Sequence, residues 1–127
     1  MDTTKRILVI DDEDDIREVA QIGLEMIAKW QVITASSGDE GIMKAKAEQP
    51  DAILLDVMMP DMDGPTTFRQ LQNDPMTQPI PVLLLTAKVQ SVDRRQFADL
   101  GVKGIIAKPF DPLKLSEEVT RILGWNS

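Results

Sequence analysis

The feature that most constrains the fold is a short apolar run in the middle of the chain, Ala52 to Leu55, which is followed by Asp56 and stopped by Pro60. Four consecutive apolar residues are too few for a helix, and they do not alternate with polar residues. Such a run is typical of a parallel strand that is buried on both faces. Ligand sites in parallel sheets lie beyond the carboxyl ends of the strands, so we expect Asp56 to lie at a functional edge. The alternative is that it caps the following turn.

Other short runs of the same kind also end at a polar side chain. They are Ile7 to Ile10 before the acids Asp11 to Asp15, Val82 to Leu85 before Thr86, and Gly104 to Ala107 before Lys108. Gln31 to Ala35 is a further stretch of β-favouring residues. The repetition predicts five strands, and it predicts that the polar residues after them gather at one edge of a sheet.

The segments between these strands favour helices. Apolar residues recur at helical spacing, Ser37 and Glu40 fit a capping box, and Asp111 and Pro112 fit the first turn of a last helix. The predicted helices run from about Asp14 to Trp30, from Ser37 to before Pro50, from Pro65 to Gln72, from Ser91 to Leu100, and from Asp111 or Pro112 to Leu123. Strands that alternate with helices predict an α/β fold with a parallel sheet covered on both faces.

The amino-acid composition excludes several classes of function. The 127 residues, 43% of them hydrophobic, suit one domain over residues 1–127. Cysteine and histidine are absent, so carboxylates, lysines and hydroxyls are the available chemical groups. The net charge of -7 argues against direct binding to nucleic acid or to an anionic membrane. The polar N-terminus fits neither a signal peptide nor a membrane span, so we expect a cytoplasmic protein.

The polar residues at the predicted edge suit phosphoryl chemistry. Asp11, Asp12 and Asp56 would form a hard oxygen site of the kind that binds Mg²⁺. Lys108 would neutralise charge on a transferring phosphoryl group, the Thr86 hydroxyl would donate to it, and Asp56 would be the nucleophile. Favourable charges at a helix N-terminus are the alternative for the acids, worth about 0.3 to 1 kcal/mol each. The adjacent acids at a strand end are better explained by a cation, because they otherwise repel each other.

Four segments in this order resemble the receiver domain of two-component response regulators, over essentially the whole chain. They are Ile10-Asp11-Asp12-Glu13, Leu55-Asp56-Val57-Met58-Met59-Pro60 with Asp63-Gly64, Leu85-Thr86-Ala87, and Lys108-Pro109-Phe110. The resemblance implies a flavodoxin-like doubly wound (βα)5 sandwich with strand order 2-1-3-4-5. From the length of the chain we expect a single receiver domain without an effector domain, and the resemblance implies that it acts as a phosphoacceptor in signalling and not as an enzyme.

The resemblance assigns a role to each site residue. Asp56 would accept a phosphoryl group from the phosphohistidine of a sensor histidine kinase or a histidine phosphotransfer protein. Mg²⁺ would be bound by the side chains of Asp12 and Asp56, by the backbone carbonyl of Met58, and by Asp11 partly through water. Thr86 would hydrogen-bond the phosphoryl group, Lys108 would pair with it, and the Lys108-Pro109 bond would be cis. A target protein would dock on the surface made by the fourth helix, fifth strand and fifth helix.

Three positions qualify these roles. The family commonly has Tyr or Phe three residues before the lysine, where this chain has Ile105. A β-branched aliphatic side chain has few rotamers and no hydroxyl, so the usual aromatic switch cannot operate. Either the surface responds more subtly, or activation uses backbone movement and another partner contact. Met58 and Lys88 occupy variable positions that, in the family, affect how fast the phosphoryl group hydrolyses.

Other classes of function fit less well. A Mg²⁺-dependent phosphohydrolase with an aspartate nucleophile typically has an Asp two residues after it, where this chain has Met58. A flavin or nucleotide carrier would need glycines and free amides after the first strand, where the acids would repel phosphate. A receiver-like scaffold that is not phosphorylated remains an alternative. A stand-alone receiver that docks to a target or passes phosphate onward is the expected biology.

Overall fold

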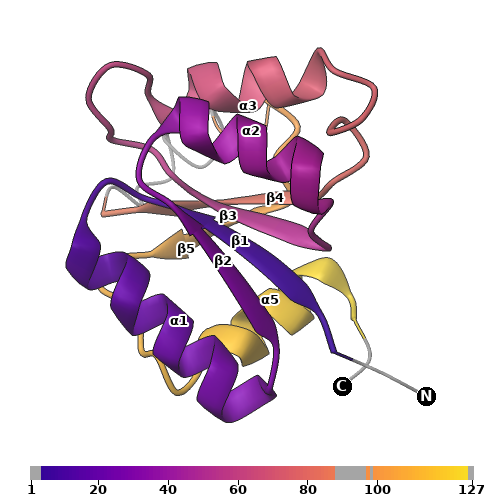
Figure 1. Cartoon of the computed structure of the whole chain (residues 1–127). Coiled ribbons are helices and arrows are strands. Elements are labelled where there is room, and N and C mark those ends of the chain that lie inside the picture. Colours follow the sequence, from indigo (N-terminus) through magenta and orange to yellow (C-terminus); the bar gives the residue numbers. More distant parts are fainter. Residues whose placement is uncertain (1–3, 88–96, 98, 126–127) are drawn as a thin grey trace.

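The computed structural model describes residues 4–87, 97 and 99–125 (Figure 1). Its strands are β1 (Arg6–Ile10), β2 (Gln31–Ala35), β3 (Ala52–Asp56), β4 (Val82–Thr86) and β5 (Gly104–Ala107). All neighbouring strands pair in parallel, in the order β2-β1-β3-β4-β5. The predicted α/β class, the strands and the order 2-1-3-4-5 are confirmed.

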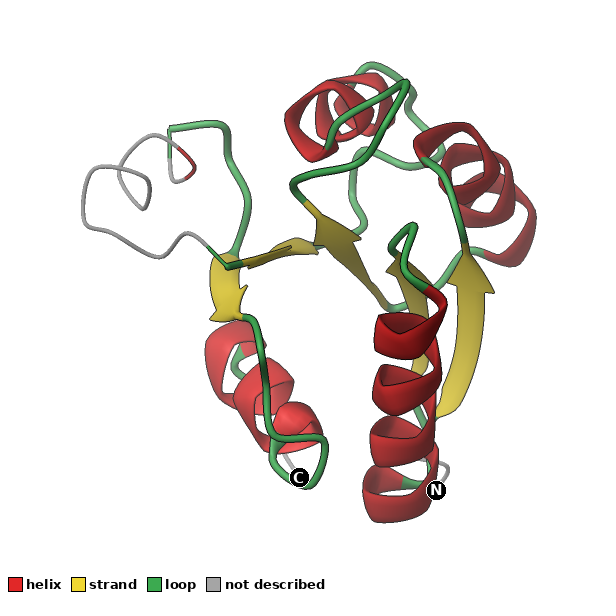
Figure 2. Ribbon diagram, turned by 90° about the vertical axis from the view of Figure 1, so that its left-hand side faces the viewer, coloured by secondary structure: helices red, strands yellow, loops and turns green. Residues whose placement is uncertain are grey.

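Helices cover both faces of this sheet (Figure 2). They are α1 (Asp14–Ala28), α2 (Gly38–Glu48), α3 (Gly64–Gln72) and α5 (Leu115–Leu123). α1 and α5 lie on one face, and α2 and α3 lie on the other. The helix predicted from Ser91 to Leu100 falls mostly outside the described residues. None of the helices in the described part of the chain is long and apolar enough to cross a membrane.

Successive residues of each central strand point to opposite faces and join two separate cores. In β3, Ile53 and Leu55 belong to one core, and Ala52 and Leu54 belong to the other. We call the first the α2/α3 core, whose buried members on these two helices are Ala45, Phe68 and Leu71. We call the second the α1/α5 core, whose helical members are Ala20, Leu24, Leu115 and Val119. Burial on both faces explains why the strands read as unbroken apolar runs.

The ends of two helices differ slightly from the prediction. α1 ends at Ala28, because Lys29 adopts a left-handed conformation with φ 61° and caps the helix. At the start of α2, the Ser37 hydroxyl accepts a hydrogen bond from the Glu40 amide at 3.1 Å, as the capping box predicts. The Glu40 carboxylate, however, accepts from the amide and hydroxyl of Ser36, at 2.6 and 2.9 Å. The second hydrogen bond of the capping box is therefore made with Ser36, one residue before the expected partner Ser37.

The start of α5 was predicted wrongly. The helix begins at Leu115, not at Asp111 or Pro112. The Asp111 carboxylate accepts from the Leu113 amide, and its carbonyl accepts from the Lys114 amide, both at 2.9 Å. These bonds close a separate turn before the helix. Asp111 therefore caps that turn and not the first turn of α5.

Two tryptophans pack together near the amino ends of the strands. The rings of Trp30 and Trp125 meet edge to face, with centroids 5.6 Å apart and planes at 78°. The Lys5 ammonium lies 4.7 Å from the centroid of the Trp125 ring. Both tryptophans also pack against the α1/α5 core. The three side chains line a groove of about 630 Å³ that lies beside the C-terminal end of α1 and runs along α5.

Leu54→Ala is expected to lower the free energy of unfolding by about 2 to 5 kcal/mol, because it leaves a cavity in the fully buried α1/α5 core. Urea denaturation followed by circular dichroism measures the change. The matched control is Leu113→Ala, which truncates an exposed leucine and is expected to stay within about 0.5 kcal/mol of wild type. Equal losses in the two variants would contradict this account of the core.

Candidate functional site

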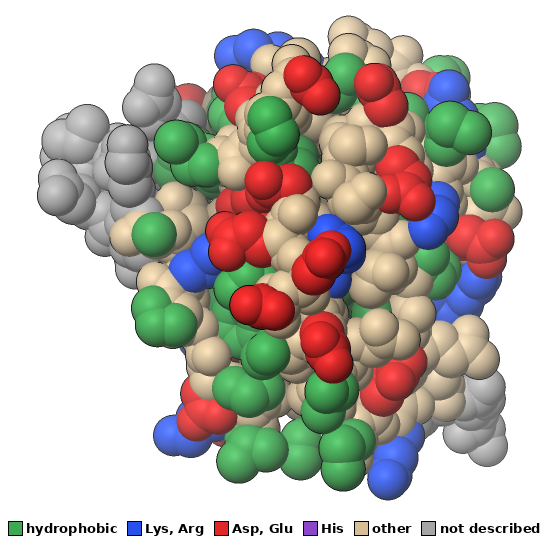
Figure 3. Space-filling view, turned by 60° about the vertical axis from the view of Figure 1, so that its left-hand side comes forward, with side chains coloured by type: hydrophobic (Ala, Val, Ile, Leu, Met, Phe, Trp, Pro, Cys, Tyr) green, Lys and Arg blue, Asp and Glu red, His purple; other side chains and the backbone are tan. Residues whose placement is uncertain are grey.

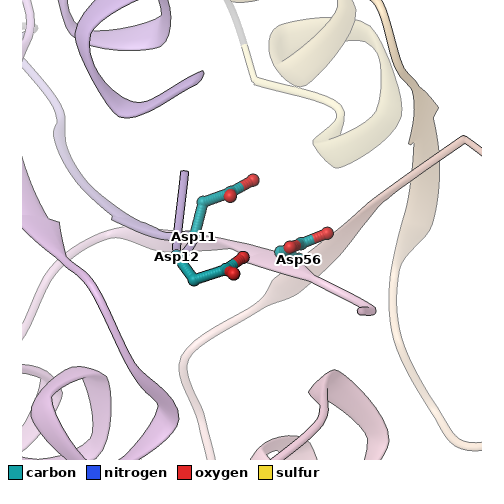
Figure 4. A group of neighbouring side chains, drawn as sticks. All are labelled: Asp11, Asp12 and Asp56. Carbon is teal, nitrogen blue, oxygen red and sulfur yellow. The ribbon is translucent and has the colours of Figure 1, made fainter. Parts of the chain in front are cut away.

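The carboxyl edge of the sheet brings together acidic side chains from two strands. The register pairs Ile10 with Leu55, so Asp11 follows β1 beside Asp56 at the end of β3. Figure 4 shows Asp11, Asp12 and Asp56 gathered at this edge. One carboxylate oxygen from each of the three lies within 4.8 Å of the others, which is close enough for all three to bind one ion.

Lys108 contacts two of the three carboxylates of this cluster. It follows β5, and its Nζ lies 2.7 Å from Asp11 Oδ2 and 3.0 Å from Asp56 Oδ1. Glu13 Oε1 is more distant, at 3.9 Å. The lysine side chain is only 11% exposed, so these contacts are poorly screened by solvent. One ammonium thus joins the ends of β1 and β3 to the end of β5.

Two carboxylate oxygens at the site are buried without a hydrogen bond. These are Asp11 Oδ2 and Asp56 Oδ2, within the described part of the chain. The ion pair of Asp11 Oδ2 with Lys108 is short, but it lacks the geometry of a hydrogen bond. Asp56 Oδ2 has no hydrogen bond and is not the oxygen that pairs with Lys108. A buried oxygen of this kind is costly, and a bound cation would satisfy it. The donors are all carboxylate oxygens, so the residues fit Mg²⁺, which favours hard oxygen ligands.

The electrostatics of the site keep Asp56 protonated to a higher pH than an ordinary aspartate, and the side chain is mainly deprotonated above about pH 6. Burial raises the pKa of Asp56 to about 6, and the charge of Asp11 adds to this effect. The hydrogen bond from Lys108 and its positive charge partly oppose the rise. Burial also disfavours the charged lysine, but the contacts with Asp11 and Asp56 outweigh it and raise the pKa of Lys108. The lysine therefore stays positively charged at neutral pH.

Thr86 and Met58 are the other predicted site residues. Thr86 ends the strand between β3 and β5, and Met58 follows Asp56 by two residues. Thr86 is the buried last residue of β4, and its carbonyl accepts from the Lys108 amide at 3.0 Å. The Met58 amide donates to Asp56 Oδ1 at 3.4 Å, while its side chain is 65% exposed. The Lys108-Pro109 peptide bond is cis, as expected.

The loop after β3 folds back tightly over the aspartate. The Gly64 amide donates to the Val57 carbonyl at 3.0 Å. A Cβ atom at position 64 would lie 2.4 Å from the Asp56 carbonyl oxygen, so only glycine fits without a backbone shift. Asp63 caps α3 by accepting from the Thr66 amide at 2.8 Å. This loop fixes the backbone on which Asp56 and Met58 lie.

Arg17, on the first turns of α1, contacts the site although the sequence analysis assigned it no role. Its Nη1 donates to the Asp11 carbonyl at 2.8 Å, and its Nη2 pairs with the Asp14 carboxylate. The spacing of three residues between Asp14 and Arg17 is the available sequence signal, because such residues are neighbours on a helix. The contact between Arg17 and the Asp11 carbonyl joins a helix to a loop, and no spacing in the sequence indicates it.

The acidic site continues onto the surface. Asp12, Glu13, Asp14 and Asp15 are all exposed. Figure 3 views the molecule from the side of α1 and shows many acidic side chains gathered there. Such a surface attracts cations and repels polyanions.

This fold and this site define a known class of signalling module. Residues 7–120 match the response regulator receiver domain family, and the chain belongs to this family. It is 41% identical over 119 residues to the alkaline phosphatase synthesis transcriptional regulatory protein PhoP of Bacillus subtilis, and 42% identical over 118 residues to the DNA-binding dual master transcriptional regulator RpaA of Synechocystis. These matches cover 94% and 93% of this chain but 48% of each relative, so the chain spans about half their length.

A solved structure shows the same fold. The chemotaxis protein CheY4 of Vibrio cholerae superposes with a TM-score of 0.87 at 28% identity, covering 94% of this chain and 99% of that one. The flavodoxin-like architecture expected from the sequence is therefore shared with a chemotaxis receiver. The chain is a receiver domain of the two-component response regulator class.

Asp56→Asn is expected to stabilise the protein above about pH 6 when no divalent ion is present. Because the pKa of Asp56 rises from 3.8 to about 6 on folding, wild-type stability falls as pH rises through this window. The loss is at most about 3 kcal/mol, and the variant avoids it. Urea denaturation in chelator, at about pH 4 and at neutral pH, measures the difference.

The control for this comparison is Asp39→Asn, which changes an exposed aspartate in the first turn of α2. Asp39→Asn is expected to destabilise the protein by at most about 1 kcal/mol, because it removes a favourable charge from the start of a helix, and not to stabilise it at either pH. A stabilisation by Asp56→Asn that is as large near pH 4 as at neutral pH would show that removal of the buried charge is not its cause.

Proposed function

We propose that this chain is a phosphoacceptor whose Asp56 takes a phosphoryl group from a histidine kinase or a histidine phosphotransfer protein. One observation supports this most directly: Asp56 is buried beside Lys108 within a cluster of three carboxylates, and one of its oxygens has no hydrogen bond. A purely structural ion pair would not need the third carboxylate or the open oxygen. Membership of the receiver family agrees with this role.

The chemistry is a transfer of the phosphoryl group from nitrogen to oxygen. A carboxylate oxygen of Asp56 attacks phosphorus, a P–O bond forms, the P–N bond to the donor imidazole breaks, and the imidazole nitrogen leaves with the electron pair. The reaction needs Asp56 deprotonated, which its pKa of about 6 allows at neutral pH. The Lys108 ammonium is placed to pair with an oxygen of the phosphoryl group, and the Thr86 hydroxyl is proposed to donate to another.

Asp11, Asp12, Asp56 and the backbone carbonyl of Met58 are the proposed ligands of Mg²⁺. When bound, the ion supplies positive charge that offsets the negative charge of the phosphoryl oxygens. Lys108 already bridges two of these carboxylates, so the chain holds a cationic group beside the acceptor before any ion binds. We propose that the lysine shifts its pairing from Asp56 to the phosphoryl group after transfer.

The output is proposed to be a change in protein binding, with any hydrolysis of the acyl phosphate catalysed by the domain itself. The target surface would include β5 and α5, together with the segment of the fourth predicted helix. Ile105 is partly buried and packs against the α2/α3 core. We therefore propose that β5 transmits the change through its backbone or through small shifts of this side chain. The relatives PhoP and RpaA are named as transcriptional regulators, but the acidic charge of this chain argues against direct contact with DNA.

Incubation with acetyl phosphate and Mg²⁺ is expected to add one phosphoryl group to the wild-type protein and none to Asp56→Asn. Intact-mass spectrometry counts the adducts, and chelation of Mg²⁺ is expected to abolish labelling. Asp39→Asn, which alters an exposed aspartate outside the carboxylate cluster, is the control and should label as wild type does. Labelling that persists on Asp56→Asn would refute the acceptor assignment. A wild-type protein that is never labelled would favour the non-phosphorylated scaffold.

A further inference from the structure

We propose that Arg17 is a positioning residue for the acidic site, which it serves by holding the backbone of Asp11 and so aligning Asp11 and Asp12 for Mg²⁺. The inference rests on the proposed function, because it concerns the same metal site. Arg17 does not belong to the carboxylate cluster itself. It acts from α1, behind the loop that carries two of the three acids.

Every polar group of Asp11 has a fixed contact. Its amide donates to the Ala35 carbonyl at 3.1 Å, and its Oδ1 accepts from the Glu13 amide at 2.9 Å. Its Oδ2 pairs with Lys108. Its carbonyl lies beyond the end of β1 and accepts from Arg17 Nη1 at 2.8 Å. Arg17 therefore holds the peptide group that joins Asp11 to Asp12.

Arg17 is itself held by contacts at the start of α1. Its amide donates to the Glu13 carbonyl at 3.2 Å as α1 begins, and its guanidinium pairs with Asp14 in the first turn. The side chain is 19% exposed, so most of its length is packed. A planar guanidinium can serve two acceptors at once in a fixed geometry. Here it spans from the helix to the loop, and the loop cannot rotate without breaking that contact.

Position and charge predict opposite effects on the ion. If Arg17 acted only through its positive charge, removing it would strengthen Mg²⁺ binding, because like charges repel. If it orients the ligands, removing it would weaken binding, since residues that orient metal ligands typically contribute about 10- to 100-fold to affinity. The sign of the change therefore separates the two roles.

The experiment measures Mg²⁺ affinity by isothermal titration calorimetry for wild type, Arg17→Met, Arg17→Lys and the control Arg69→Met. Arg69 is an exposed arginine on α3, so its replacement removes one positive charge without touching the loop after β1. Arg17→Met is expected to bind Mg²⁺ about 10-fold more weakly than wild type. Arg17→Lys, which retains one donor for the carbonyl, is expected to recover part of the loss. Arg69→Met is expected to bind as wild type does.

A second readout separates positioning from a general loss of structure. Urea denaturation in chelator gives the folded fraction of each variant, and the titrations are done where all are folded. At saturating Mg²⁺, labelling of Arg17→Met by acetyl phosphate is expected to approach the wild-type rate, because the defect lies in ion binding. If Arg17→Met does not fold, Arg17→Lys is decisive, and wild-type affinity in that variant overturns the inference.

The outcomes for the inference and for the proposed function are distinct. Affinity of Arg17→Met equal to or tighter than that of Arg69→Met overturns the positioning role while leaving Mg²⁺ binding intact. A wild-type protein that binds no Mg²⁺ overturns the metal site of the proposed function instead, whatever Arg17 does. Weaker binding by Arg17→Met together with normal binding by Arg69→Met supports both.

Discussion

The contact of one lysine with two buried aspartates organises the carboxyl edge of this protein. Asp11 and Asp56 are buried beside each other, which is unfavourable for two negative charges unless a cation lies between them. Lys108 supplies that cation from the edge strand β5, across β4, and so ties three strand ends together. The cation offsets only part of the burial cost, as the raised pKa of Asp56 shows. The remaining cost leaves the site able to gain from a further cation or from conversion of the carboxylate to an acyl phosphate.

Those features that depend on regular patterns could be predicted from the sequence. The central strands β1, β3 and β4 were predictable because burial on both faces leaves unbroken apolar runs. The parallel order of the sheet then places Asp11, Asp56 and Lys108 at one edge. The start of α5 was not predictable, since an Asp that closes a turn has the same local signature as an Asp that caps a helix. The contact between Arg17 and the Asp11 carbonyl was not either, because a bond to the backbone of a loop leaves no trace in side-chain periodicity. The features that could not be predicted are thus those decided by individual local hydrogen bonds.

The alternation along β5 bears on how the site is coupled to the rest of the molecule. Ile105 packs against the α2/α3 core, whereas Ile106 is buried in the α1/α5 core. Phe110, two residues after Lys108, packs against the α1/α5 core as well. The segment that carries the lysine therefore lies between both hydrophobic layers. An aliphatic side chain at position 105 keeps this segment in contact with one layer, and it has no ring that can turn outward.

The paired rings of Trp30 and Trp125 give the protein an intrinsic fluorescent probe that does not touch the carboxylate site. They lie near the amino ends of the strands, and the five residues of β1 and of β3 put about 16 Å between them and the carboxylates. An ion or a phosphoryl group at Asp56 cannot quench their emission by collision. The rings share the α1/α5 core with Phe110, so any change in their emission when the site is filled would report movement carried through that core.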